Sequence, residues 1–370
     1  MHLKRIWPCL LFFTVLAGCA AEAPPEAGSP TYDCSRIPAA PLEINELAAP
    51  RGSKDLAFDA FGYVTGFDGF SLVRANLAGD TQVLTTADFG GEGPDGLEYL
   101  PDGRLLGASQ NQGVFTVTPD GAINSLLPDL REVFGLLLWP DGMVYAGDNA
   151  NIYRIDPRLG TATVLLRGQD YPELGEFRPR IVNFTLDYST MIIGTHENQL
   201  FRVPVDPALN PVGDPVFWLD VAGSFSGVDG LVVDVCGNFY VPSYPDELYR
   251  ITPDGVAHLY HKWAGVEAFG HGVRWGTGRD GWREDALYLP RPYGGYTVVE
   301  VVTGVPGRRQ MPEPQRGDAH LLSCRTGSPG SRAGAPGSQP AKTTLMLLTI
   351  TLFLHLRTRA RRRGRPGGSP

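Results

Sequence analysis

The sequence predicts an all-β fold, a β-propeller of six blades, and three observations support this. A motif made of an apolar strand, a turn rich in Gly and Asp, and two further strands returns six times. The copies follow one another at roughly 40–48 residues, the length of one four-stranded blade. The strand-like runs are short, and between the two terminal segments no run has the pattern of a helix of three turns or more. Such units cannot bury a core alone, so we expect them to close into a ring.

The copies can be followed along the chain, and the clearest is the fifth. It begins at Val228 and reads VDGLVVDVCGNFYVPSYPDELYRITPDGVAHLY. The other five begin near Lys54, Pro94, Val133, Ile181 and Phe269. A further strand, Pro41–Leu47, precedes the first copy. We expect this N-terminal strand to complete the last blade and hold the ring shut.

The N-terminal residues lie outside the propeller, which we place at 41–310. Residues 1–18 have a basic start, an apolar stretch and the sequence Leu-Ala-Gly before Cys19, the layout of a bacterial lipoprotein signal. This predicts cleavage before Cys19, lipidation of its thiol and a linker over 19–40. Ala20 stands where an Asp would favour the inner membrane, so the outer membrane is favoured. An ordinary signal peptide with a chance Cys is the alternative.

The C-terminal residues also lie outside the predicted propeller. A linker rich in Pro, Gly and Ser (311–342) leads to an apolar segment (343–356) and a basic tail (357–370). The apolar segment is short for a bilayer span, which needs about 20 residues. The arrangement resembles C-terminal sorting signals of myxobacterial type, although Cys324 lies far upstream of the apolar segment. A retained anchor and a cleaved sorting signal both stay open, and either places the propeller at the bacterial cell envelope, outside the cytoplasm, with the cell surface as one location.

Charge is segregated along the chain. Residues 325–370 carry nine Lys or Arg and residues 1–19 carry two, with no acidic residue in either segment. The whole chain has a net charge of −8, so residues 20–324 carry −19. An acidic body repels nucleic acid and favours cations or cationic surfaces. We therefore expect no nucleic-acid partner, and we expect a monomer that contacts the membrane through the Cys19 lipid, the C-terminal segment or both.

Three cysteines remain after the predicted processing, in a compartment that permits disulfides. They are Cys34, Cys236 and Cys324. Cys34 precedes the closing strand, and Cys236 lies in the first turn of the fifth copy. Both turns should lie on the face away from the channel mouth, so the pair Cys34–Cys236 is favoured. The pair Cys34–Cys324 and three separate thiols stay open.

Functional residues are expected where the innermost strand of each blade begins, because these positions meet at one mouth of the channel. Read across the six copies, the position holds Asp55, Asp95, Phe134, Asn183, Asp229 and His271. Carboxylates that face one another in a confined site raise each other's pKa unless a cation compensates them. Oxygen donors of Asp and Asn suit Ca²⁺ or another hard divalent cation. The sequence therefore predicts a divalent-cation site at the mouth.

Three strings carry a resemblance to a known family. They are Asp229–Val241 (D-G-x-x-x-D-x-x-G-N-x-Y-V), Asn183 in its strand, and Glu92 in the sequence Glu-Gly-Pro. Residues 41–307 resemble the family of senescence marker protein, gluconolactonase and luciferin-regenerating propellers. The resemblance implies one divalent ion held by Glu92, Asn183 and Asp229, with Asp229 also acting as the base that hydrolyses a sugar lactone.

The chain departs from that family pattern in two places. Phe134-Gly135 stands where the family has Asn-Asp or Pro-Asn-Gly. Glu-Gly-Pro opens the second blade instead of the first, so Asp95 is the alternative ligand to Glu92. His271 offers a further acid or base in the channel.

Three functions are consistent with these residues. One is a propeller that binds a small molecule or a protein at its mouth. The second is a Ca²⁺-dependent lactone or ester hydrolase, and the third is a structural scaffold. The fold alone does not select a function. The missing ligand in the third blade counts against the hydrolase and so favours the binding propeller.

Overall fold

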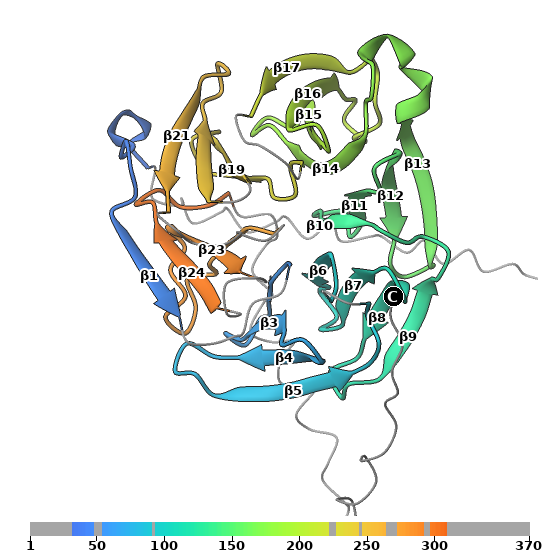
Figure 1. Cartoon of the computed structure of the whole chain (residues 1–370), viewed down its shortest axis with the longest axis vertical. Coiled ribbons are helices and arrows are strands. Elements are labelled where there is room, and N and C mark those ends of the chain that lie inside the picture. The colour runs from blue at the N-terminus through green and yellow to red at the C-terminus, as the bar shows by residue number, and fades with distance from the viewer. Residues whose placement is uncertain are drawn as a thin grey trace, which may run out of the picture. The chain divides into compact units, whose positions relative to one another are not determined.

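The structure of the protein, a computed structural model, describes residues 32–47, 54–90, 93–221, 227–243, 246–263, 272–291 and 297–308. Its strands form six antiparallel sheets of four strands each, arranged as blades around a central axis (Figure 1). The helices among the described residues are three short 3-10 turns, η1 (Cys34–Arg36), η2 (Gly168–Asp170) and η3 (Pro172–Leu174). The prediction of an all-β, six-bladed propeller is confirmed.

The first three blades follow the chain in order, from the innermost strand outward. Blade 1 consists of β2 (Ala57–Phe58), β3 (Val64–Phe67), β4 (Ser71–Ala75) and β5 (Thr81–Thr86). Blade 2 consists of β6 (Gly96–Tyr99), β7 (Leu105–Ser109), β8 (Gly113–Val117) and β9 (Ile123–Leu127). Blade 3 consists of β10 (Phe134–Leu138), β11 (Val144–Gly147), β12 (Asn151–Asp156) and β13 (Thr161–Arg167).

The next two blades keep this order, and the sixth recruits a strand from the other end of the chain. Blade 4 consists of β14 (Pro179–Phe184), β15 (Thr190–Thr195), β16 (Gln199–Pro204) and β17 (Val216–Asp220). Blade 5 consists of β18 (Val232–Val233), β19 (Phe239–Ser243), β20 (Glu247–Ile251) and β21 (Ala257–Lys262). Blade 6 consists of β22 (Arg274–Trp275), β23 (Ala286–Arg291), β24 (Thr297–Val302) and β1 (Glu43–Leu47).

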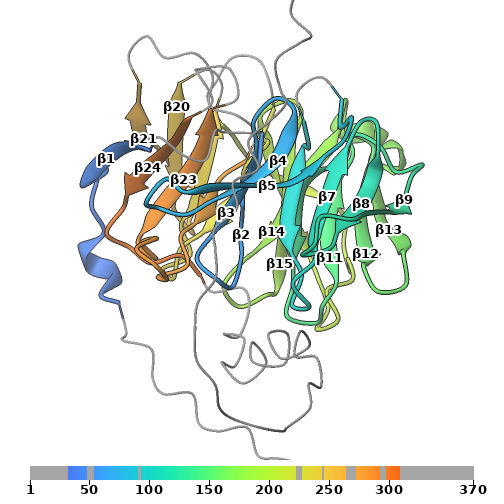
Figure 2. The same ribbon diagram turned by 90° about the horizontal axis from the view of Figure 1, so that it is seen from below.

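The N-terminal strand closes the ring as predicted. β1 pairs antiparallel with β24, from Glu43 opposite Val302 to Leu47 opposite Val298. The two strands lie side by side at the edge of the propeller in both ribbon views (Figures 1 and 2). The outermost strand of blade 6 therefore comes from the start of the chain, so the first and last blades cannot separate without breaking this pairing.

A disulfide ties the same N-terminal segment to a second blade. Cys34 in η1 is bonded to Cys236, in the turn between β18 and β19, with 5.6 Å between their Cα atoms. The pairing favoured by the sequence is confirmed, and Cys324 lies outside the described residues. Arg250 in β20 also donates to the carbonyl of Pro38. The N-terminal segment thus joins blade 6 through a strand and blade 5 through a covalent bond.

The residues after β24 form a second tie, which we call the C-terminal strap, Thr303–Arg308. Gly307 forms a β-bridge with Asp234, and the Arg308 N–H donates to the carbonyl of Val233 at 3.0 Å. The Arg308 side chain reaches further, to the carbonyl of Phe184 in blade 4 at 2.8 Å. The strap therefore runs from blade 6 past blade 5 to blade 4.

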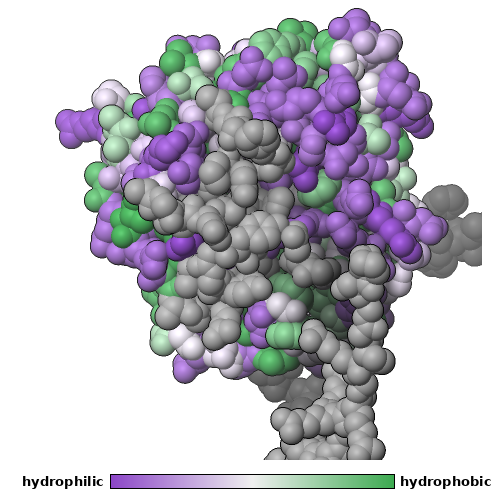
Figure 3. Space-filling model, in the orientation of Figure 1, coloured by the Kyte–Doolittle hydropathy of each residue, from purple (hydrophilic) through white to green (hydrophobic). Residues whose placement is uncertain are grey.

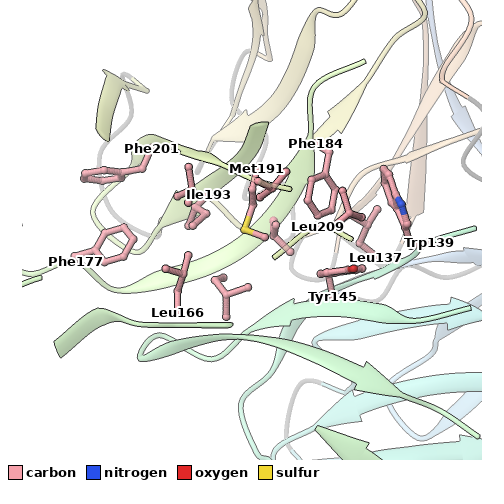
Figure 4. Packing of buried hydrophobic residues seen from close by; sticks show 14 residues of the cluster. Leu137, Trp139, Tyr145, Leu166, Phe177, Phe184, Met191, Ile193, Phe201 and Leu209 are labelled. Atoms are coloured by element: carbon pink, nitrogen blue, oxygen red, sulfur yellow. The ribbon is translucent and has the colours of Figure 1, made fainter. Parts of the chain in front are cut away.

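Apolar side chains fill the space between neighbouring blades. Between blades 3 and 4, Tyr145 and Trp139 pack against Phe184, with ring centroids 5.2 Å and 4.6 Å apart (Figure 4). Met191 and Ile193 of β15 are fully buried in the same cluster. Aromatic rings supply a large buried area in such cores and prefer the edge-to-face and tilted geometries found here.

The segments predicted to be terminal addresses lie beyond the part of the chain that the structure describes. Residues 1–18 with Cys19, and residues 311–370, all fall there. Within the described ranges, no helix is long and apolar enough to cross a membrane.

We expect the disulfide to carry much of the stability of the closed ring. The bond spans 202 residues of chain, and closing so long a loop in the unfolded state corresponds to about 5 kcal/mol in the chain-entropy treatment. Replacing both cysteines (Cys34→Ser with Cys236→Ser) should lower the free energy of unfolding by several kcal/mol, measured in guanidinium chloride. A reductant should shift the wild type toward the variant and leave the variant unchanged. Equal stability of the two proteins would contradict the expectation.

Candidate functional site

The first hairpin turn of each blade fixes which residues face the channel mouth. One backbone hydrogen bond closes every such turn, and its donors are Asp59, Leu100, Trp139, Thr185, Asp234 and Gly276. Counting back five residues from each donor gives the same place at the start of each innermost strand. In the first five blades that place holds Lys54, Asp95, Phe134, Arg180 and Asp229. We call these five residues the mouth ring; the corresponding residue of blade 6, His271, lies outside the described residues.

The mouth ring agrees with the sequence prediction at three positions and differs at two. Asp95, Phe134 and Asp229 lie where they were expected. Asp55 lies one residue further along the chain than the ring position of blade 1, and Asn183 lies three residues beyond that of blade 4, near the end of β14. The prediction matched polar residue to polar residue, whereas the backbone takes its register from the hairpin turn. Glu92 also falls outside the described residues.

Two members of the mouth ring pair across blades 1 and 2. The Lys54 Nζ lies 2.7 Å from Asp95 Oδ1, and both side chains are buried. Bringing an ammonium and a carboxylate out of water costs several kcal/mol per ion, which their attraction offsets at this distance. Asp95 therefore has its counter-charge supplied by the neighbouring blade.

Arg180 contacts the two remaining members of the ring, Asp229 and Phe134. Its Nε lies 2.7 Å from Asp229 Oδ1 in blade 5, and its guanidinium stacks 4.0 Å from the centre of the Phe134 ring in blade 3. Its Nη1 is 3.2 Å from His196 Nδ1. Burial lowers the pKa of His196, and the positive charge of Arg180 lowers it further. The imidazole is therefore neutral at pH 7, and Nδ1 accepts from the arginine.

Asp55 is bound by an arginine from the last blade. Arg274 in β22 donates from Nε to Asp55 Oδ1 at 3.1 Å and from Nη2 to Oδ2 at 2.5 Å. Gly272 makes the approach possible, because a Cβ at that position would lie 2.2 Å from Asp55 Oδ1. The same guanidinium lies 2.9 Å from Glu98 Oε2 in β6. Burial raises the pKa of Glu98 to about 7, although Arg274 opposes the shift.

Asn183 forms its hydrogen bonds at the end of the channel opposite the mouth. Its side-chain N–H donates to the Leu231 carbonyl at 2.8 Å, and its Oδ1 accepts from Arg308 Nη2 at 2.7 Å. Arg308 belongs to the C-terminal strap and also lies 5.2 Å from the centre of the Trp139 ring. Burial lowers the pKa of Arg308 to about 10, which still leaves it charged at pH 7.

These contacts decide whether the predicted ligands suit a divalent cation. Asp55, Asp95 and Asp229 each bind a Lys or Arg side chain, and Asn183 presents its oxygen to Arg308. A divalent ion there would face four positive groups that already use its ligands. Among the described residues, no group of three or more His, Cys, Asp or Glu side chains could hold a metal ion. As they are paired here, Asp55, Asp95, Asn183 and Asp229 do not fit a divalent cation.

A small cavity lies within the channel. It has a volume of about 30 Å³ and is lined by apolar residues, glycines and three charged residues, Asp55, Asp229 and Arg274. A space of this size holds about one water molecule. This cavity is too small for a sugar or a peptide, so we look for a ligand surface at the mouth ring and the turns around it.

Four basic residues of this channel were not predicted from the sequence: Lys54, Arg180, Arg274 and Arg308. Lys54 and Arg180 could have been found by counting back from the hairpin turns, because both occupy the same register as Asp95 and Asp229. Arg308 gave no such signal, since it comes from beyond the last repeat and meets a strand 125 residues earlier in the chain.

Comparison with protein-family models finds no match, and comparison with curated protein sequences finds none either. Solved structures do match the fold. A calcium-binding protein, regucalcin, from Agrobacterium tumefaciens aligns with a TM-score of 0.56 and 20% identity over 70% of this chain and 93% of its own. A gluconolactonase from Xanthomonas campestris aligns with a TM-score of 0.54 and 16% identity over 73% and 92%.

A third solved structure is an auxiliary nutrient-binding protein from Bacteroides thetaiotaomicron. It aligns with a TM-score of 0.51 and 12% identity, over 70% of each chain. At such identities the likeness concerns the fold. A regucalcin and a gluconolactonase are thus among the structures that share this fold, consistent with the family resemblance of the repeats.

We expect the pair Arg180–Asp229 to be strongly coupled, because both side chains are buried. Removing one partner of a buried ion pair typically costs about 3–5 kcal/mol, and removing both costs far less than twice that. A double-mutant cycle with Arg180→Met and Asp229→Asn, followed by urea unfolding, should give a coupling energy of at least about 2 kcal/mol. The exposed pair Arg104–Asp102 is the matched control and should give at most about 1 kcal/mol. Additive effects at Arg180 and Asp229 would refute a coupled pair.

We expect stability to respond to pH through Glu98. Its pKa is about 7 in the folded protein against 4.5 for an unperturbed Glu, so the folded state binds more protons between these values. Its contribution is therefore full below pH 4.5 and is lost as the pH rises through 7. The melting temperature of the wild type minus that of Glu98→Gln should fall between about pH 5 and pH 8. A difference that does not change with pH would contradict this.

Proposed function

We propose that this protein is a binding propeller of gluconolactonase-like fold at the bacterial cell envelope, and that it recognises a polar ligand or partner at its mouth without a metal ion. The observation that carries the proposal is the charge pairing of the mouth ring. Every described carboxylate of the ring has a basic partner from a neighbouring blade, as in Lys54–Asp95 and Arg180–Asp229. Because these carboxylates already have a basic partner, the ring favours recognition of a polar ligand over a metal-dependent reaction.

The residues around the mouth suit a polar ligand. The turns between the second and third strands of the blades open on the mouth side and carry amide and acid side chains, among them Asn111, Gln112, Asp148, Asn149 and Glu197. Groups of this kind bind hydroxyl and amide groups through hydrogen bonds. The described surface in Figure 3 is likewise mostly hydrophilic, with apolar residues in small separated groups. Sugars and short peptides have the matching chemistry.

The metal-dependent hydrolase is the second candidate, and the fold of the regucalcin and gluconolactonase neighbours favours it. That mechanism asks Asp229 to bind a metal and to accept a proton. In this chain Asp229 Oδ1 lies 2.7 Å from Arg180 Nε. Arg180 therefore occupies one of the oxygens through which Asp229 would bind the metal or accept the proton. The fold thus allows the hydrolase, whereas the ion pair favours binding.

The envelope location is supported by the disulfide and by the predicted terminal addresses. Disulfides persist in oxidising compartments such as the periplasm and the cell surface. The bond Cys34–Cys236 links the N-terminal segment to blade 5 of the propeller. We place the protein outside the cytoplasm on this basis, with lipid on Cys19 and the segment 343–356 as its membrane contacts.

The experiment is a thermal-shift screen of the purified protein with neutral sugars, sugar lactones and short peptides, each with Ca²⁺ and with EDTA. We expect metal analysis to find no stoichiometric metal, and a polar ligand to raise the melting temperature equally in both conditions. Lactone hydrolysis is followed in the same samples and should be absent. Calcium-dependent opening of a lactone, abolished by Asp229→Asn, would overturn the proposal in favour of the hydrolase.

A matched variant locates the binding surface. Arg180→Gln together with Asp229→Asn keeps the shape of the pair and removes both charges. We expect this double variant to fold and to lose the ligand-induced shift. Arg104→Gln with Asp102→Asn, an exposed pair in a turn of blade 2, should retain it. A ligand that stabilises both variants equally would bind elsewhere than the mouth ring.

A further inference from the structure

The guanidinium of Arg274 lies in a cage of oxygen atoms. Its five N–H groups meet both carboxylate oxygens of Asp55, Oε2 of Glu98 at 2.9 Å, and the carbonyl oxygens of Leu97 at 2.6 Å and Leu136 at 3.2 Å. These oxygens come from blades 1, 2 and 3, while Arg274 comes from blade 6. One side chain therefore gathers oxygen ligands from three other blades.

This set of oxygens has the chemistry of a calcium site. Calcium ions take six to eight oxygen ligands from carboxylates, backbone carbonyls and water. The cage supplies two carboxylates and two backbone carbonyls, and the adjoining cavity of about 30 Å³ offers room for a coordinated water. Arg274 lines that cavity together with Asp55 and Leu136.

The charge of the cage also matches a dication better than its present occupant. Asp55 and Glu98 bring two negative charges when both are ionised, and Arg274 brings one positive charge. Asp55 and Glu98 raise the pKa of Arg274 above its ordinary value although burial lowers it, so the arginine is charged throughout. One negative charge therefore remains in the cage when both carboxylates are ionised. A divalent cation would balance both carboxylates.

We propose that Arg274 is a tethered cation that fills a latent divalent-metal site, distinct from the predicted site at Asn183, Asp229 and Glu92. The wild type needs no metal at this place because the chain supplies the positive charge itself. Removing the Arg274 side chain leaves five oxygens, three of them from the two carboxylates, around a space the size of a guanidinium, and that space takes Ca²⁺.

The test is calcium binding by Arg274→Ala in the full-length protein. We expect the variant to melt below the wild type without metal, and 1 mM Ca²⁺ to raise its melting temperature by about 5 °C, as a site with a Kd on the order of 10⁻⁵ M requires. EGTA should reverse the shift, and Mg²⁺ should produce a smaller one because it demands a stricter octahedral geometry. The wild type should shift by less than about 1 °C, since its site is filled by the arginine.

Two further variants separate a latent site from a simple tie between blades. Arg274→Gln fills part of the space with a neutral group and should not respond to Ca²⁺. Arg274→Ala with Glu98→Gln carries the same net charge as the native cage, which favours folding, and should bind Ca²⁺ at least about tenfold more weakly than Arg274→Ala. Calorimetric titration measures both affinities.

The outcomes are decisive in either direction. If Arg274→Ala is destabilised or unfolded, and Ca²⁺ neither restores it nor binds to it in the calorimetric titration, then Arg274 is only a tie and the proposal is wrong. The proposed function fails separately, through calcium-dependent lactone opening by the wild type. The latent metal site is thus tested with the Arg274 variants, and the proposed function with the wild type and the variants of the mouth ring.

Discussion

Six innermost strands converge on one axis that water barely reaches, and this chain puts charged side chains there. A buried charge costs several kcal/mol unless an opposite charge lies close by. Lys54 with Asp95 and Arg274 with Asp55 meet this demand, and in both pairs the two partners come from different blades. The pair of Arg274 in blade 6 with Asp55 in blade 1 forms only when the ring closes, so closure of the ring completes the pairing of charges.

The segments before and after the repeats tie blades together at the far end of the channel. The C-terminal strap carries Arg308 from blade 6 to Asn183 in blade 4, and the N-terminal segment is bonded through Cys34 to blade 5. Neither tie belongs to the repeat. A repeat can specify how one blade packs on the next, but it does not specify how the last blade is held. The N-terminal segment and the C-terminal strap hold the last blade in place.

Most of the fold was accessible from the sequence, whereas only part of the site was. Strand order, the closing strand and the favoured disulfide follow from local patterns and from their place in the repeat. Asp55 and Asn183 were assigned to the mouth because polar residues were matched across copies, and a shift of one or three residues along a strand changes what faces the channel. The pairing of Arg180 with Asp229 depends on that register. Arg308 depends on a long-range contact that no local pattern contains.

The pairing of β1 with β24 also has a kinetic consequence. The ribosome synthesises Glu43 early, whereas its partner Val302 is among the last residues of the propeller to be made. Contacts between residues so far apart form slowly, because a long loop must be closed before they can stabilise the fold. Until then blade 6 lacks its outermost strand, and the unpaired edge of β24 offers a template for another chain. The nascent propeller is thus most exposed to misassembly just before its ring closes, and export in an unfolded state would postpone that moment until the whole chain is present.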